Sequence, residues 1–191
     1  MRRCWRTAIL AAAALLLAAA TAPAQQPTKV IYGLSIPDRI GGLAYKETID
    51  FESKSPGLGY AVRFSGRPDW QVDVYLYDMQ LKAISADVGS PVVKDQLAQA
   101  KGDVFALGKR GAYANVSEQG DFAIPESGKA RFICTSFSYL RGERVDIDVE
   151  SYLCLTSWNN KFVKIRMTGR KGSIARSDAV DFAKEWIALL R

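Results

Sequence analysis

The clearest pattern of hydrophobic and polar positions lies at Gln71–Asp78, where Val72, Val74 and Leu76 alternate with other residues. A period of two is typical of a strand whose two faces meet different surroundings. On the other face, Tyr75 and Tyr77 are interpreted as packing residues whose hydroxyl groups reach water. Weaker runs bounded by Gly and Pro predict further strands at 30–32, 44–51, 60–64, 112–116, 121–124, 130–140, 145–157 and 162–168.

Two amphipathic helices complete the predicted fold. The first begins with Ser90 as N-cap and Pro91 in the first helical position, and ends at Gly108 or Gly111. The second runs from about Ser177 to the C-terminus. Apolar residues recur at spacings of three and four, at 93, 97, 100, 104 and 107 and again at 179, 182, 183, 186, 189 and 190. The pattern predicts an α+β fold, a mainly antiparallel sheet packed with two main helices. It forms one domain over 25–191, of which 25–43 is an irregular lead-in.

The connection between the last two strands has two possible registers. A two-residue turn at 159–160 places Leu155 opposite Lys164, whereas a three-residue loop at 159–161 places Leu155 opposite Ile165. The first arrangement puts a cation beside a core residue. Because a one-residue slip moves every side chain to the other face, the hydrophobic pattern favours the three-residue loop.

Cys134 and Cys154 provide a second constraint on register. If they lie opposite each other, Ile133 lies opposite Leu155 and the core face stays apolar along its length. The third cysteine, Cys4, lies in the predicted signal at residues 1–24, so the mature chain has two. Two cysteines in an oxidising compartment are typical of one disulfide. We therefore expect a cross-strand Cys134–Cys154 disulfide on the face opposite the main core.

The face that carries these cysteines is unusually aromatic and basic. Its predicted members are Phe132, Tyr152, Trp158, Phe162, Lys164, Arg166 and Arg170. One interpretation is that a helix or the lead-in covers this face, since a sheet between helical layers is common. The functional alternative is a binding surface formed by Phe132, Tyr152, Trp158, Phe162 and Arg166, because exposed aromatic residues beside arginine are typical of interfaces.

Residues 1–24 are predicted to be a cleaved secretory signal rather than part of the fold. Three arginines precede an apolar run over Ala8–Ala20, and Ala22-Pro23-Ala24 supplies a cleavage site. The run has 13 residues, whereas a membrane-spanning helix needs about 20. We expect a periplasmic protein with no stable membrane insertion after cleavage.

Composition narrows the chemistry further. Loss of the signal lowers the formal net charge from +6 to +3, which does not favour nucleic acid as a partner. The chain has no histidine, so Ser-His-Asp and Cys-His catalysis and histidine-bound zinc are excluded. Asp146, Asp148 and Glu150 stand about 7 Å apart along one strand, too far apart to share one calcium ion. No catalytic residue, metal site or cofactor is predicted.

The order of elements resembles the PsbP-like superfamily of α/β sandwiches. The likeness rests on Val72–Asp78, the helix at Ser90-Pro91, the hairpin Tyr152–Thr168 and the helix Phe182–Leu190. It implies a domain used for binding or assembly, with no functional residue carried across. We expect a non-catalytic periplasmic domain that binds an envelope protein or a small ligand. A carboxylate-based hydrolase and a structural envelope component remain the alternatives, and the oligomeric state is not predicted.

Overall fold

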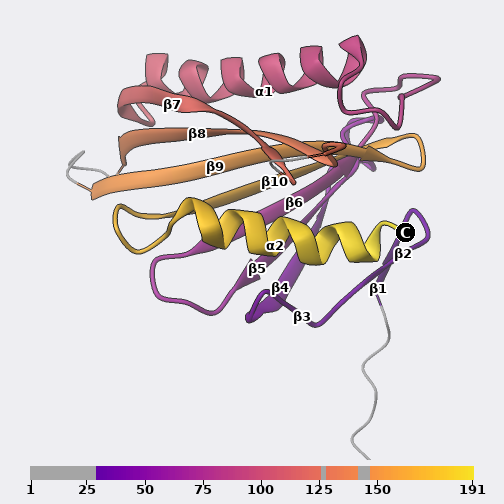
Figure 1. Cartoon of the computed structure of the whole chain (residues 1–191), viewed down its shortest axis with the longest axis horizontal. Coiled ribbons are helices and arrows are strands. Elements are labelled where there is room, and N and C mark those ends of the chain that lie inside the picture. The colour runs from indigo at the N-terminus through magenta and orange to yellow at the C-terminus, as the bar shows by residue number, and fades with distance from the viewer. Residues whose placement is uncertain (1–28, 126–127, 142–146) are drawn as a thin grey trace, which may run out of the picture.

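A single antiparallel sheet between two helices forms the body of the protein (Figure 1). The computed structural model describes residues 29–125, 128–141 and 147–191, so the predicted signal at 1–24 lies outside the described part. The sheet has eight strands in the order β3-β4-β5-β6-β10-β9-β8-β7. Helix α1 (Pro91–Lys109) covers one face and helix α2 (Arg176–Leu189) the other. The α+β prediction is confirmed.

Most predicted elements occur within about two residues of their expected bounds. The strands are β1 (Lys29–Ile31), β2 (Leu34–Ile36), β3 (Arg39–Ile40), β4 (Leu43–Asp50), β5 (Tyr60–Ser65), β6 (Gln71–Tyr77), β7 (Ala114–Ile124), β8 (Phe132–Arg141), β9 (Ile147–Trp158) and β10 (Lys161–Arg170). The lead-in differs from its irregular prediction, because β1 and β2 form a hairpin and β3 joins the main sheet. Strand β7 is one strand with two register shifts, where two short strands were predicted.

The sheet buries both of its faces, each in its own hydrophobic core. On the α2 face, Phe64 and Phe182 pack around Trp186, which is fully buried. On the α1 face, Leu97 and Leu155 belong to a smaller core. A sheet with a helix packed on each face is a three-layer arrangement.

The register of β8 on β9 is the predicted one. Cys134 lies directly opposite Cys154 and the two form a disulfide with their Cα atoms 4.0 Å apart. Both cysteines are buried in the core under α2, which is the larger of the two. The predicted disulfide is therefore confirmed, whereas its expected place opposite the main core is wrong.

The predicted register of β9 on β10 is wrong. The strands join through a two-residue turn in which Asn159 and Asn160 have φ values of 45° and 58°. Positive φ at both positions is the geometry that suits the twist of a short hairpin, and Asn tolerates it. Leu155 consequently lies opposite Lys164. The prediction assumed one apolar core face, but α1 covers the second face and the cations of β10 lie beneath it.

Candidate functional site

The five residues predicted to form one binding surface lie on opposite faces of the sheet. Phe132 and Tyr152 are buried in the α2 core, and Trp158 packs against it. Phe162 is fully buried in the α1 core, on the same side as Arg166. The expected common face is thus an error that follows from the wrong β9–β10 register. The other interpretation, that helices cover this part of the sheet, agrees with the structure.

Arg166 is held by neutral acceptors beneath α1. Its guanidinium donates hydrogen bonds to the hydroxyl groups of Tyr113 and Tyr139, both at 3.2 Å, and to Ser151 at 3.4 Å. The two tyrosine rings stack with their centres 4.2 Å apart. Burial opposes the charge, but Tyr139 and Tyr113 outweigh it and keep the pKa of Arg166 above its ordinary value. All of this is typical of a structural cation that its neighbours satisfy.

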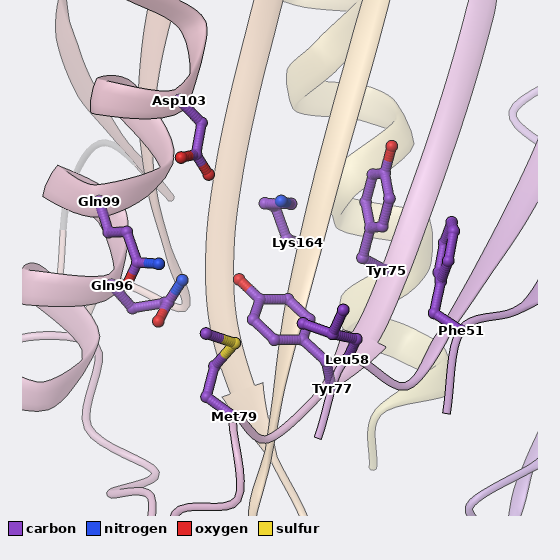
Figure 2. A pocket seen from close by; sticks show the side chains of 9 residues that line it. All are labelled: Phe51, Leu58, Tyr75, Tyr77, Met79, Gln96, Gln99, Asp103 and Lys164. Atoms are coloured by element: carbon purple, nitrogen blue, oxygen red, sulfur yellow. The ribbon is translucent and has the colours of Figure 1, made fainter. Parts of the chain in front are cut away.

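Lys164, two residues earlier on the same face of β10, lines a pocket between α1 and the sheet. The cavity has a volume of about 240 Å³. Figure 2 shows α1 side chains on one side of the pocket and those of β6 and β10 on the other. The residues that line the pocket, called the Lys164 pocket below, are Phe51, Leu58, Tyr75, Tyr77, Met79, Gln96, Gln99, Asp103 and Lys164.

The Lys164 ammonium has aromatic neighbours and no ionic partner. Its Nζ lies 4.5 Å from the ring centre of Tyr75 and 5.4 Å from that of Tyr77. Within the described ranges, no carboxylate forms an ion pair with it and no acceptor hydrogen bonds to it. Burial lowers the pKa of Lys164, and the nearby charge of Arg166 lowers it further, while Asp103 acts in the opposite direction. Lys164 is therefore a poorly solvated cation that faces a cavity.

Tyr77 places a second unsatisfied polar group at the pocket. The side chain is buried against Phe162, with ring centres 5.4 Å apart. No described atom meets hydrogen-bond geometry with its hydroxyl oxygen, although the Gln96 side chain lies near enough to influence it. Burial raises the pKa of Tyr77, so the hydroxyl remains a neutral donor. Buried hydroxyl groups without a protein partner are uncommon, and ordered water or a ligand can supply the missing partner.

Two exposed apolar side chains stand at the mouth of the pocket. Leu58 is 44% exposed and Met79 is 37% exposed. Their loops are tied to each other, because the Met79 N–H donates to the Gly57 carbonyl at 2.8 Å. The Glu52 carboxylate accepts hydrogen bonds from the N–H groups of Gly57 and Gly59, at 2.9 and 2.8 Å. The mouth is thus held in place before any ligand arrives.

Further contacts fix the loop that leads from β6 to α1. Lys161 forms an ion pair with Asp78 at the end of β6. The Asn160 carboxamide accepts a hydrogen bond from the Ile84 N–H at 2.7 Å and donates one to the Lys82 carbonyl at 3.3 Å. The β9–β10 turn, which sequence reasoning placed in the wrong register, therefore anchors one side of the pocket.

The pocket supplies donors and apolar surface more readily than acid–base chemistry. Asp103 is the one carboxylate among its nine lining residues, so the pocket does not provide the carboxylate pair of the alternative hydrolase. No cluster of three metal-ligating side chains occurs in the described part of the chain. Asp148 is exposed, Glu150 lies opposite Gly169, and Asp146 lies outside the described residues.

Sequence reasoning singled out two components of the pocket without joining them. The Tyr77 hydroxyl group was expected to reach water, but it is buried. Lys164 was assigned to the wrong face of the sheet. One feature of the sequence could have indicated the correct face. Lys164 and Arg166 alternate with apolar residues, and the neighbouring strands are apolar on both faces, as expected for a sheet that is covered on both sides.

Comparison with known proteins adds no family assignment. The chain matches no protein-family model and no curated protein. Over the described residues, no helix has the length and apolar character that a membrane crossing requires.

Proposed function

We propose that the chain is an exported, non-catalytic domain that binds a small ligand in the Lys164 pocket. The observation that carries this proposal is the Lys164 ammonium, which faces a cavity and has no ion-pair or hydrogen-bond partner in the described structure. A desolvated cation with no counter-ion destabilises a fold, and such groups cluster at binding sites. The volume of about 240 Å³ lies below the roughly 300–1,000 Å³ typical of pockets for drug-sized ligands. The proposed ligand is accordingly small.

Export rests on two independent features. The pattern of residues 1–24 is typical of a secretory signal. The buried Cys134–Cys154 disulfide is compatible with an oxidising compartment such as the periplasm. We expect the exported protein to begin at Gln25, which N-terminal sequencing of the periplasmic fraction would test. A chain that retains Met1 and stays in the cytoplasm would contradict this part of the proposal.

The binding function is tested with three probes of one shape: hexanoate, hexanamide and hexylamine. Calorimetric titration of the mature chain is expected to give saturable binding of at least one probe. Gln99 is an exposed α1 residue that lines the pocket, so Gln99→Trp should fill the mouth and abolish binding. Asp95→Trp, one turn earlier on α1 and outside the lining, is the matched control. The proposal fails if no probe binds, or if both variants bind as the unmodified protein does.

A further inference from the structure

We infer that the Lys164 pocket selects a small monocarboxylate with an apolar body. This inference rests on the proposed function and adds the chemical class of the ligand. Three features of the pocket point to that class: an excess of positive charge under α1, a set of donors that lack acceptors, and exposed apolar side chains at the mouth.

The positive charge on the α1 face of β10 exceeds the negative charge available to it. Lys164 and Arg166 lie two residues apart on this face. Asp73 is the cross-strand neighbour of Arg166, but its carboxylate is engaged by Arg63 at 2.8 Å and by Gln71 at 2.6 Å. Asp103 is the one carboxylate that lines the pocket, and it favours the Lys164 charge without forming an ion pair with it in the described structure. Two cations thus face one carboxylate, and an anionic ligand would balance the excess positive charge.

Lys164 and Tyr77 give the pocket donors that lack acceptors. The three N–H groups of the Lys164 ammonium have no acceptor among the described residues. The Gln96 side chain approaches the Tyr77 oxygen as a donor, and no described acceptor meets hydrogen-bond geometry with the Tyr77 O–H. A carboxylate carries two oxygens that only accept, so it can take both donors at once. The side chains of Gln96 and Gln99, on the facing side of α1, each carry an amide NH₂ donor beside a carbonyl acceptor (Figure 2).

The mouth of the pocket suits an apolar body. Leu58 and Met79 keep much of their apolar surface in water although they belong to anchored loops. Phe51 and the ring of Tyr75 extend this surface along the pocket. A hydrocarbon chain that covers these side chains removes apolar area from both partners, which favours binding.

Asp103 limits the ligand to one negative charge. It lies on α1 across the pocket from the sheet and is exposed at the rim (Figure 2). A second carboxylate on the ligand would meet this like charge, which is unfavourable. The pocket should therefore prefer a monocarboxylate to a dicarboxylate of the same length.

The test compares hexanoate with hexanamide, and then with adipate. Hexanoate is expected to bind at least about tenfold more tightly than hexanamide, because a charge-assisted hydrogen bond replaces a neutral one. Lys164→Met should weaken the binding of hexanoate about tenfold or more and change the affinity for hexanamide by no more than about twofold. Lys171→Met removes an exposed cation outside the pocket lining and should change neither affinity.

Two further variants examine the other groups. Tyr77→Phe removes the hydroxyl alone and should weaken hexanoate by about three- to tenfold. Asp103→Asn should strengthen the binding of adipate more than that of hexanoate, so the difference in affinity between the two acids should become smaller. Melting temperatures measured beside each titration separate loss of binding from loss of folding.

The outcomes distinguish this inference from the proposed function. If hexanoate and hexanamide bind equally, or if hexylamine binds best, the inference of a monocarboxylate ligand is overturned. Loss of probe binding in Gln99→Trp would still support the proposed ligand pocket in that case. Unchanged hexanoate affinity in a folded Lys164→Met protein also overturns it. If hexanoate does not bind at all, the inference is wrong whatever the other probes do.

Discussion

The Nζ atom of Lys164 lies 4.5 Å from the centre of the Tyr75 ring, over a strand neighbour that offers it no charge. A cation over an aromatic ring gains up to about 2 kcal/mol when it is desolvated. The loss of water around a buried ammonium costs several kcal/mol when no counter-ion compensates it. Asp103 offsets part of this cost, but burial and Arg166 outweigh it and lower the pKa of Lys164. The Lys164 charge therefore destabilises the free protein at the proposed binding site.

Lys164→Met should stabilise the ligand-free protein at neutral pH. The methionine side chain fills a similar space and removes the desolvated charge, and stabilising changes of this kind are commonly worth about 1 kcal/mol. Urea unfolding of the two proteins measures the difference. Lys171→Met is the control, because the exposed ammonium of Lys171 loses little solvation on folding. A lower free energy of unfolding in Lys164→Met would mean that the lysine stabilises the fold.

The stabilisation should also depend on pH. The folded-state pKa of Lys164 is lowered from 10.5, so the unfolded chain binds the proton more tightly. The stability of the unmodified protein should rise as pH increases through the lowered pKa toward 10.5, and the advantage of Lys164→Met should shrink. The facing groups are Asp103 on α1, Arg166 on β10, and Tyr75 and Tyr77 on β6. Burial raises the pKa of both tyrosines above the ordinary value of 10.0, and both are present in the unmodified protein and in Lys164→Met. If the difference in free energy of unfolding between the two proteins did not change with pH, the lowered pKa of Lys164 would be contradicted.

The helices and strands could be predicted because they depend on residues that are close in the sequence. The disulfide could be predicted because it depends on a single pair of cysteines. Ser90-Pro91 does begin α1, although the Ser90 hydroxyl forms no cap hydrogen bond and is buried without a described partner. Cys134 and Cys154 fixed the β8–β9 register, because a disulfide requires two specific residues to be neighbours.

The pocket was not predictable in the same way, because it depends on which layers cover the sheet. Placing Lys164 opposite Leu155 looked unfavourable for a sheet with one core face. With α1 over the second face, Tyr113 and Tyr139 satisfy Arg166, and the cavity accommodates Lys164. Tyr139 and Tyr113 precede Arg166 by 27 and 53 positions in the sequence, and no local pattern joins them.

Arg166→Met should have the opposite effect to Lys164→Met. The substitution removes three hydrogen bonds and leaves the hydroxyl groups of Tyr113 and Tyr139 without their donor. We expect a loss of about 2 kcal/mol in the free energy of unfolding. Arg170→Met, at an exposed arginine on the same strand, should change stability by no more than about 0.5 kcal/mol. Equal effects of the two variants would show that the tyrosine contacts do not stabilise the fold.

Reduction of the Cys134–Cys154 disulfide should destabilise the protein by about 3 kcal/mol, the value expected from the entropy of a loop of 20 residues. Urea unfolding with and without reductant measures this loss. Alkylation followed by peptide mass spectrometry should label neither cysteine before reduction and both after it. Labelling of the two peptides in the native, unreduced protein would contradict the disulfide.

Asn160 and Asn159 separate the effect of turn geometry from that of a side-chain anchor. Both have positive φ, which glycine also adopts, so Asn160→Gly should keep the turn and lose only the hydrogen bonds to Ile84 and Lys82. We expect a cost of about 1–2 kcal/mol and faster amide exchange at Ile84. The Asn159 side chain forms no hydrogen bond within the described structure, so Asn159→Gly should stay within about 0.5 kcal/mol of the unmodified protein. If both variants lose the same stability with Ile84 still protected, turn conformation rather than the Asn160 anchor positions this side of the Lys164 pocket.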